Sequence, residues 1–383
     1  MSQQNYALSI CYAISLLDEG TGQTARLLQL MSYSSKKVNS TVIAPTIRLF
    51  TNALPDLARI HKSKTYYFAF LDHSVIESMR QSDVVVVNSG IPYFIAAIIS
   101  RRPIVYILQQ PDPVFIFLGK ERLNRLLARI IERPFLLRKA TVLVSISPWI
   151  KTWFLNRFGL DSIVIAESFD LSIFKRSEST IRREIDSAGP HLLCVGGWDG
   201  YQGRKRTHEL IELLPESKIV FPNVRLSLVG LSDRAKYELG QLAIRLNVMN
   251  DVRLVGKLET EELVKEYNAA DVFVTATLVE GFYRPLLEAF ACGIPGVVRD
   301  ASDSIDAVSQ ATVHHINNSG GGALYDSSAR SYINAIRTVL ENYETMSTNA
   351  ITYAKTFDNT ILMPKYFEIF NNLSHISPKR RSR

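Results

Sequence analysis

Residues 271–300 read DVFVTATLVEGFYRPLLEAFACGIPGVVRD, and this stretch decides the fold. Its first apolar run, Val272–Thr275, is rich in β-branched residues and is typical of a buried strand. Pro285 suits the first turn of a helix, because proline lacks an N–H that this turn leaves unpaired. Gly293 can end that helix in the left-handed conformation, and Pro295 leads into a further apolar run. The stretch therefore predicts a strand, a loop, a helix and a second strand.

The same alternation of strands and helices runs through the whole chain. The other strand-like runs are Leu8–Ile14, Thr41–Ala44, Val84–Val87, Ile104–Leu108 and Val142–Ile146 in the first half, and Leu192–Val195, Arg225–Val229, Val252–Leu254 and Gly296–Val298 in the second. Helical patterns such as Glu261–Ala269 and Ser331–Leu340 separate them. This order predicts α/β architecture with parallel sheets. Two sets of five strands in 383 residues predict two Rossmann-like domains rather than one large sheet.

We expect the first domain to span residues 1–168 and the second to span residues 169–355. Residues 356–378 are expected to form a C-terminal helix that returns to the first domain, and the basic tail 379–383 is expected to be disordered. Ligands of doubly wound sheets bind beyond the carboxyl ends of the strands. The default site is then the cleft between the two domains, and its motifs should lie in strand-exit loops.

The composition is that of a globular protein, with 46% hydrophobic and 21% charged residues. No apolar run approaches the ~18 residues that span a bilayer. The apolar run Ala7–Leu17 has no positive charge before it, which disfavours a signal peptide. The three cysteines, Cys11, Cys194 and Cys292, stand singly in apolar segments. This favours a reducing compartment over a disulfide framework or a zinc site, and we expect a cytoplasmic protein.

The net charge of +7 comes from the first part of the chain, because residues 1–170 hold 19 basic against 12 acidic side chains and residues 171–383 hold 25 of each. Much of it lies in residues 119–139, GKERLNRLLARIIERPFLLRK, which combine a net charge of +5 with leucines and isoleucines at helical spacing. Such a helix suits the surface of an anionic membrane. The alternative is an apolar stripe packed on the domain core under solvated cations. A basic half could also meet a phosphorylated substrate; no nucleic acid is expected.

Two glutamates mark the loop and helix of residues 271–300 as a candidate site. Backbone N–H groups around Tyr283–Leu287 and the helix dipole favour an anion there. Glu280 in the approach loop can accept hydrogen bonds from sugar hydroxyls, and Glu288, one turn into the helix, can bind a ribose diol. The alternative is an ordinary strand-loop-helix with two solvated acids.

These residues closely resemble the signature of retaining GT-B glycosyltransferases of sequence family 4, E-G-F-G-x-P-x-x-E-A-x-A-C-G-x-P. The matching residues are Glu280-Gly281-Phe282, Pro285, Glu288-Ala289, Ala291-Cys292-Gly293 and Pro295. The likeness extends to residues 250–271 and 321–326, and more loosely to residues 146–159 and 170–174. It implies the GT-B fold, in which two Rossmann-like doubly wound domains face each other across a cleft. It also implies the metal-independent transfer of a sugar, with retention, from a nucleotide-diphosphate donor.

A second element lies at the exit of the strand-like run Leu192–Val195. Gly196-Gly197 follow this run, and Gly203-Arg204-Lys205-Arg206 precede a helical pattern. Clustered cations fit a diphosphate, because they neutralise the charge that grows on a leaving group. In the family an arginine and a lysine hold the donor phosphates, and Arg204 and Lys205 fall on those positions. The alternative is a solvated basic helix start.

The first half carries two candidate elements. Gly20-Thr21-Gly22-Gln23-Thr24-Ala25 matches the dinucleotide pattern G-x-G-x-x-A, but the second strand ends without an acid, since the next one is Asp56, and this disfavours a nicotinamide or flavin. The resemblance implies a loop near the donor sugar and the acceptor; the alternative is a plain tight turn. Gln109 stands where many family members carry a sugar-contacting histidine and some rhamnosyltransferase-like members carry glutamine.

The resemblance assigns Lys205, Arg204 and Glu280 to catalysis. It assigns donor binding to Glu288, Gly281, Phe282, Tyr283, Pro285, Leu286, Gly196, Gly197, Gly256, Gly22 and Gln109. Tyr283 and Arg284 replace the small and apolar residues common after E-G-F, which alters the expected sugar pocket.

No metal site is expected, because the chain has no Asp-x-Asp pair and no histidine pattern; His314-His315 is interpreted as a polar loop pair. No cofactor is expected beyond the nucleotide-sugar co-substrate. The acceptor would be a saccharide, a lipid-linked or another small molecule. The alternatives are a sugar-nucleotide epimerase or phosphorylase on the same fold, or a non-catalytic protein that binds nucleotide sugars.

Overall fold

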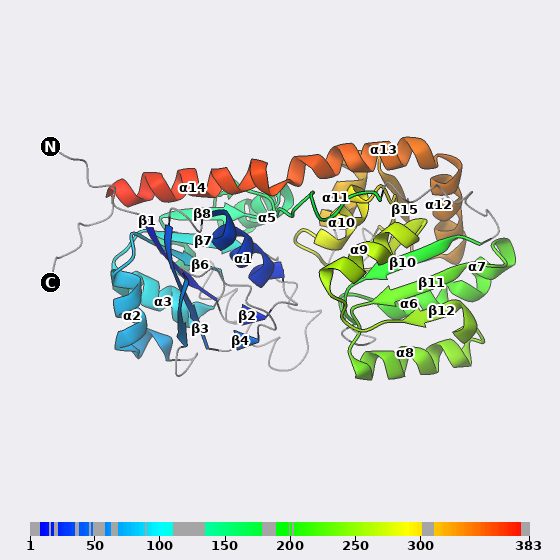
Figure 1. The fold of residues 1–383 in the computed structure, drawn as a ribbon, viewed down its shortest axis with the longest axis horizontal. Coiled ribbons are helices and arrows are strands. Elements are labelled where there is room, and N and C mark those ends of the chain that lie inside the picture. The colour runs from blue at the N-terminus through cyan, green and yellow to red at the C-terminus, as the bar shows by residue number, and fades with distance from the viewer. Residues whose placement is uncertain are drawn as a thin grey trace. The chain divides into compact units, whose positions relative to one another are not determined.

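The fold is given by a computed structural model. The residues that it describes are 8–14, 17–18, 22–34, 38–45, 47–48, 58–62, 68–88, 90–109, 135–177, 189–198, 200, 203–300 and 310–376. They divide into two compact units (Figure 1). Unit 1 takes the described residues up to Ser168 and those from Asn359 onward, and unit 2 takes residues from Phe169 to Asp358.

Unit 1 contains a seven-stranded parallel sheet in the order β5-β3-β1-β6-β7-β8-β9. Its strands are β1 (Leu8–Ala13), β3 (Val38–Ala44), β5 (Ala58–Lys62), β6 (Val84–Val87), β7 (Ile104–Leu108), β8 (Val142–Ser145) and β9 (Ile163–Val164). A separate parallel pair joins β2 (Leu17–Asp18) to β4 (Ile47–Arg48). Every residue of β6 and β7 is buried, which explains their continuous apolar sequences, because strands covered on both faces have no polar side.

The helices of unit 1 are α1 (Gly22–Ser34), α2 (His73–Arg80), α3 (Ile91–Ser100), α5 (Pro148–Phe158) and α14 (Asn359–Ile376), with the short 3-10 helices η1 (Ala69–Leu71) and η3 (Leu137–Lys139). Local sequence sets the ends of α5: the Ser147 hydroxyl accepts from the Ile150 N–H, and Gly159 ends the helix at a φ of 62°. The last helix, α14, packs on α1 and β6, with Tyr366 and Phe370 fully buried (Figure 1).

Unit 2 contains a six-stranded parallel sheet in the order β12-β11-β10-β13-β14-β15. Its strands are β10 (His191–Val195), β11 (Arg225–Val229), β12 (Val252–Leu254), β13 (Val272–Thr275), β14 (Gly296–Arg299) and β15 (Gly322–Tyr325). Its helices are α6 (Thr207–Glu212), α7 (Leu214–Val220), α8 (Asp233–Arg245), α9 (Thr260–Ala269), α10 (Arg284–Ala291), α11 (Gln310–Ser319), α12 (Ala329–Glu341) and α13 (Tyr343–Ala354), with η4 (Met249–Asp251) and η5 (Lys355–Phe357). Helices α6, α7, α8 and α12 share one hydrophobic core with the sheet, and α10 and α11 pack on α13.

Each sheet reverses its strand order at one point. In unit 1 the chain runs from β1 outward to β3 and β5 and then returns to β6 on the other side of β1. In unit 2 it runs from β10 to β11 and β12 and then returns to β13 on the other side of β10. Connections that diverge from two neighbouring strands leave a crevice beyond their carboxyl ends, where open α/β sheets bind ligands. The loops after β1 and β6 in unit 1, and those after β10 and β13 in unit 2, are therefore the expected ligand-binding loops.

The parallel α/β architecture is confirmed, whereas two finer predictions are wrong. The described sheets have seven and six strands, whereas the sequence predicts two sets of five and a short strand at Ile163–Ala166, which is β9. The edge strand β15 was missed because four residues after a glycine pair carry too little alternation to indicate a strand. His314 and His315 lie on helix α11 rather than in a loop, and His315 is buried.

Two other expectations concern residues that the structure covers only in part. Of the basic stretch 119–139, only residues 135–139 are described, so the predicted amphipathic helix lies almost wholly outside the described residues, as does the tail 379–383. Among the helices that are described, none has the length and apolarity to cross a membrane.

Candidate functional site

At the carboxyl ends of β10, β11 and β12, three glycines bring the backbones of three loops together. Gly196 leaves β10 with a φ of 143°, and Gly230 follows β11 with a φ of 94°. A Cβ on Gly230 would lie 3.5 Å from the carbonyl carbon of Gly196. The Gly230 N–H donates to the Gly256 carbonyl at 3.1 Å. Gly196 and Gly197 thus lie at the reversal point of the sheet, whereas Gly256 lies beside β12, away from it.

Beside Gly196, two cations converge on one buried carboxylate. Glu280 is 7% exposed, and its Oε1 accepts from Arg204 Nη1 at 2.7 Å and from Lys205 Nζ at 2.5 Å. The Thr277 hydroxyl oxygen lies 3.4 Å from the same carboxylate oxygen. These residues come from the loops after β10 and β13, the two strands at the reversal point. The structure therefore brings together all three residues that the sequence assigned to catalysis.

Backbone hydrogen bonds hold these two loops against each other. The Arg204 carbonyl accepts from the Leu278 N–H at 2.8 Å and from the Thr277 hydroxyl at 3.2 Å. Arg204 Nη1 in turn donates to the Val279 carbonyl at 3.2 Å. These bonds hold together the two loop backbones that carry the ion-paired side chains.

The electrostatics of the cluster follow from burial and from opposite charge. Burial lowers the pKa of Lys205, and the charge of Glu280 acts against this shift. Burial acts to raise the pKa of Glu280, but the charges of Arg204 and Lys205 outweigh it, and that pKa is lowered. With all three groups ionised the cluster carries a net charge of +1, so an anionic ligand is favoured beside it.

Tyr283 lies behind Lys205 in a conformation that glycine usually adopts. Its φ is 61°, and it precedes α10 as the N-cap residue. Its hydroxyl accepts from Thr275 Oγ1 at 3.0 Å and donates to the Val195 carbonyl at 3.2 Å, which joins β13 to β10. Lys205 Nζ lies 4.8 Å from the centre of its ring. The aromatic face thus lies against the ammonium group, a favourable cation–π contact.

Two neighbouring side chains hold the Glu288 carboxylate. It is 6% exposed, and its Oε1 accepts from Arg284 Nε at 2.6 Å while its Oε2 accepts from the Tyr267 hydroxyl at 2.9 Å. Burial raises the pKa of Tyr267, and the adjacent Glu288 carboxylate adds to that shift. Sequence reasoning missed Tyr267, because an apolar–aromatic position on a helix carries no signal for a partner 21 residues away.

The residues around Tyr283 point in different directions. The ring of Phe282 packs edge-to-face on His315 and Phe357, with centroids 5.1 Å and 5.5 Å apart, and Leu286 is fully buried. Their side chains belong to the core, so a ligand could meet only their backbone. Gly281 is buried and Pro285 is half-buried at the start of α10.

His315 supports this loop from below. Its Nε2 lies 2.7 Å from the Phe282 carbonyl oxygen, and its Nδ1 lies 3.1 Å from the Tyr353 hydroxyl. Because a carbonyl only accepts, Nε2 carries the proton and Nδ1 accepts from the tyrosine. Burial lowers the pKa of His315 to about 4, so the ring is neutral at pH 7. His315, which the sequence places in a polar loop pair, is thus a buried residue that hydrogen-bonds to the backbone just before Tyr283.

A second ion cluster adjoins the first through the next residue of the chain. Arg206, with a φ of 48°, pairs with Glu209 on α6, and Glu209 also pairs with Arg299 at the end of β14. Arg299 is 9% exposed. The pairs connect the Arg204–Arg206 loop to a third strand end, which the sequence did not predict.

In unit 1, Gln109 lies at the end of β7 and donates through Nε2 to the carbonyl and to the side-chain oxygen of Asn88, both at 2.7 Å. Gly22 is the first residue of α1, and Gly20 and Thr21 lie outside the described residues. Gln109 and Gly22 belong to unit 1, whereas Arg204, Lys205 and Glu280 belong to unit 2.

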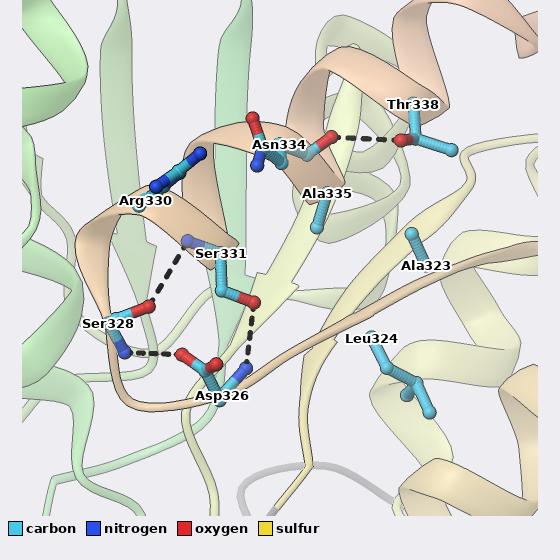
Figure 2. Close-up of a pocket in the computed structure, with 9 residues that line it drawn as sticks. All are labelled: Ala323, Leu324, Asp326, Ser328, Arg330, Ser331, Asn334, Ala335 and Thr338. Atoms are coloured by element: carbon cyan, nitrogen blue, oxygen red, sulfur yellow. Dashed lines mark hydrogen bonds between the residues drawn. The ribbon is translucent and has the colours of Figure 1, made fainter.

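A pocket of about 320 Å³ lies between β15 and α12, and it contains none of the predicted site residues (Figure 2). Its polar groups cap the helix: Ser328 accepts from the Ser331 N–H at 3.2 Å, and Asp326 accepts from the Ser328 N–H at 2.7 Å (Figure 2). The residues that the structure describes include no group of three His, Cys, Asp or Glu side chains suited to a metal ion. The Glu280 cluster remains the candidate site.

The family described as Glycosyl transferases group 1 matches residues 184–357, which include the whole cluster. Among curated proteins, the chain is similar to the GDP-mannose-dependent monoacylated alpha-(1-6)-phosphatidylinositol monomannoside mannosyltransferase of Corynebacterium glutamicum, with 28% identity over 28% of this chain and 30% of that protein. It is also similar to the O-antigen chain mannosyltransferase B of Escherichia coli, with 30% identity over 30% of this chain and 32% of that protein. The chain thus spans less than a third of the length of these two relatives.

Solved structures with the same fold extend over nearly the entire chain. Anabaena Alr3699/HepE, solved in complex with UDP and glucose, has a TM-score of 0.75 and 20% identity, and covers 95% of this chain and 100% of its own. WaaG, a glycosyltransferase involved in lipopolysaccharide biosynthesis, has a TM-score of 0.70 and 19% identity, and covers 94% of this chain and 99% of its own. The likeness shows the fold of both units.

Proposed function

We propose that this chain is a glycosyltransferase, because residues 184–357 match the Glycosyl transferases group 1 family and the fold is that of solved GT-B structures. It would move a sugar from a nucleotide-diphosphate donor to an acceptor, with retention of the anomeric configuration and without a metal ion. The observation that carries the proposal is the convergence of Arg204 and Lys205 on Glu280 at the reversal point of the sheet of unit 2.

The two cations are suited to a departing diphosphate. As the glycosidic bond breaks, negative charge grows on the leaving phosphate, and pre-positioned cations stabilise it at little reorganisation cost. Arg204 and Lys205 are already held by backbone bonds and by Glu280. A donor diphosphate would share these cations with Glu280, which would leave a carboxylate oxygen available to a sugar hydroxyl.

Glu288 would bind the ribose of the nucleotide. Its two oxygens already accept from Arg284 and Tyr267, so its position is set before a ligand arrives. Each carboxylate oxygen has a further lone pair that a ribose hydroxyl can use. With this division of roles, the diphosphate would lie between Lys205 and the start of α10.

The same charges support the proposal that no metal ion is needed. A divalent cation in other transferases neutralises the diphosphate, and here Arg204 and Lys205 would supply that charge. We expect full activity in EDTA. Activity that EDTA abolishes and that magnesium or manganese restores would contradict this part of the proposal.

The relatives suggest which ligands to test first. HepE was solved with UDP and glucose, and the Corynebacterium relative is GDP-mannose-dependent. That relative is a mannosyltransferase for a monoacylated phosphatidylinositol mannoside, which supports a saccharide or lipid-linked acceptor for this chain. Contact of residues 119–139 with an anionic membrane would suit a lipid-linked acceptor, and flotation with anionic liposomes at low and high salt tests it.

The experiment that tests the function is a thermal-shift panel of UDP-glucose, UDP-galactose, UDP-N-acetylglucosamine and GDP-mannose. A ligand at 100 times its Kd adds about 2.7 kcal/mol to the apparent stability. We expect the shift to be lost in Lys205→Ala and kept in the matched control Lys355→Ala, whose side chain is exposed.

Product analysis with the radiolabelled donor then separates the chemical classes. A labelled sugar that is linked to an acceptor with the anomeric configuration of the donor supports the retaining transferase. An epimerised nucleotide sugar, a sugar phosphate, or binding without turnover would instead indicate an epimerase, a phosphorylase or a non-catalytic binding protein.

A further inference from the structure

The reversal point of unit 1 carries a continuous hydrogen-bond network across four segments of the chain. Arg26 on α1 donates through Nη1 to Asn88 Oδ1 at 3.1 Å and pairs through Nη2 with Glu167. Asn88 follows β6, and Gln109 follows β7. Gln109 Nε2 donates to the Asn88 carbonyl and to Asn88 Oδ1, each at 2.7 Å. Residues far apart in the sequence thus meet where the sheet reverses its order.

The donors and acceptors in this network allow only one orientation of the two amides. A guanidinium can only donate, so the Asn88 atom that faces Arg26 is the oxygen. A backbone carbonyl can only accept, so the Gln109 atom that faces Asn88 is the nitrogen. Flipping either amide would place two acceptors or two donors against each other. Both N–H bonds of Gln109 Nε2 are used on Asn88, and Oε1 is left pointing away from it.

We propose that Arg26 and Asn88 are positioning residues that fix the Gln109 amide so that its carbonyl oxygen accepts a hydrogen bond from a hydroxyl of the sugar. The inference rests on the proposed function, because it names the group that Gln109 recognises. Gln109 is half-buried, and its Oε1 accepts no hydrogen bond from any residue that the structure describes. Within the described part of unit 1, no donor therefore competes with a ligand for this oxygen at the carboxyl end of β7.

The fixed orientation selects the chemistry of the ligand. An amide oxygen binds a hydrogen-bond donor, which a sugar hydroxyl supplies and which a phosphate or carboxylate oxygen does not. The sheet end of unit 2 has the opposite preference, because Arg204 and Lys205 favour an anion. The sheet end of unit 1 is thus suited to a hydroxyl group and the sheet end of unit 2 to an anion.

Arg26 acts through Asn88 and does not reach the ligand itself. Its side chain is 2% exposed, and Glu167, at 12% exposure, neutralises it. Tyr366 on α14 lies close enough for both charges to act on it, although burial is the main cause that raises its pKa to about 12. A buried, paired cation of this kind is costly to disturb, so it holds Asn88 Oδ1 in place.

The orientation is tested in the whole protein labelled with ¹⁵N-glutamine. The side-chain NH₂ signals of Gln109, assigned by their loss in Gln109→Met, should exchange with water at least tenfold more slowly than those of exposed Gln241. In Asn88→Leu the exchange should accelerate to the Gln241 rate, and in Asn88→Asp, which keeps the acceptor oxygen, it should stay slow. Equally fast exchange of Gln109 and Gln241 in the wild-type protein would overturn the proposal.

Ligand recognition is tested by calorimetry with the sugar nucleotide that gives the largest shift in the four-member panel. We expect Asn88→Leu and Gln109→Met to raise its Kd about fivefold to tenfold, as for the loss of one hydrogen bond. The Kd of the matching nucleoside diphosphate should change by less than about twofold. Asn88→Asp should restore the wild-type value for the sugar nucleotide.

The outcomes separate this inference from the proposed function. Equal losses of affinity for the sugar nucleotide and the nucleoside diphosphate would overturn the positioning role while leaving the transferase intact. If no sugar nucleotide in the panel binds, the proposed function fails. Fast exchange of the Gln109 amide in the wild-type protein would show, independently of any ligand, that Asn88 does not hold this amide.

Discussion

The surroundings of Lys205 act on its charge in opposite directions. Its side chain is 17% exposed, and burial lowers its pKa, while the Glu280 carboxylate and the face of Tyr283 stabilise the ammonium form. A diphosphate would add charge on the same side as Glu280. The residue thus gains a stronger interaction in the transition state than in the free enzyme, and this difference is what accelerates a reaction.

Replacing Lys205 with alanine should therefore reduce turnover by about 10²–10³-fold, the usual effect of removing one charge-stabilising donor. Steady-state kinetics with the donor found in the panel measure this effect. Lys355→Ala, at an exposed position, serves as the control and should keep wild-type turnover. Near-wild-type activity of Lys205→Ala would show that the cation does not act on the leaving group.

His315 makes the stability of unit 2 depend on pH. Burial lowers its folded-state pKa to about 4, against about 6.5 in the unfolded chain. As the pH falls below 6.5 the unfolded state takes up a proton that the folded state does not. The stabilising contribution is therefore present above pH 6.5 and is lost between pH 6.5 and 4, up to about 3 kcal/mol.

His315→Gln should lose less stability than the wild-type protein over this pH range, because glutamine can still donate to the Phe282 carbonyl but does not titrate. Urea unfolding at pH 7 and pH 4.5 measures the difference. The control is His375→Gln, since His375 is exposed at the end of α14. The same pH dependence in His315→Gln and in the wild-type protein would contradict the assignment.

At the scale of elements, the pairing of β14 with β15 requires two glycines. Gly296 and Gly322 lie opposite each other in the register of this pair. A Cβ on Gly322 would lie 2.0 Å from the Gly296 carbonyl oxygen, which belongs to the backbone and cannot move aside as a side chain can. The close approach explains why a strand follows a glycine pair in a sequence with little β-propensity.

Gly322→Ala should destabilise the protein by about 3 kcal/mol or more, because it forces the backbones of β14 and β15 apart. The control is Gly240→Ala in the middle of α8, where the added Cβ makes an ordinary contact of 3.5 Å with Leu254. That change should stabilise the protein by about 0.5–1 kcal/mol. Equal unfolding midpoints for the two variants would show that the strand pair tolerates the extra methyl group.

At the scale of the whole molecule, each unit has its own sheet and core, but unit 1 is completed by the last described segment of the chain. Helix α14 follows unit 2 in the sequence and packs on α1 and β6 of unit 1. Its buried side chains include Met363, Tyr366 and Phe370. Folding of unit 1 therefore depends on residues that begin about 190 positions after Ser168, where its earlier part ends, a long-range closure that costs chain entropy.

Phe370→Ala should cost about 3–5 kcal/mol, because it leaves a cavity in a fully buried position. Hydrogen exchange followed by mass spectrometry should show the largest loss of protection in α1, β6 and α14. The control is Ile361→Ala on the same helix, at a position 48% exposed, which should change stability by about 0.5 kcal/mol or less. A loss of protection centred on β10 and β13 would contradict the assignment of α14 to unit 1.

Much of the local structure could be predicted from the sequence. The runs Val84–Val87, Ile104–Leu108 and Val272–Thr275 are strands with the predicted bounds. Pro285 and Gly293 mark the start and the end of α10 as expected. These features depend on the period of apolar residues, on the fixed φ of proline and on the backbone freedom of glycine, which all act within a few residues of the chain.

The sequence by itself determined the parallel α/β architecture and the pattern of acidic and basic residues in the strand-exit loops. Only the tertiary structure decided that Glu280 meets Lys205, 75 residues away, and that Arg26 meets Glu167, 141 residues away. The same holds for Tyr267 with Glu288 and for His315 beneath Phe282. The physical reason is that such contacts depend on the order of strands in the sheet and on how helices pack across it, and a local pattern of residues carries neither.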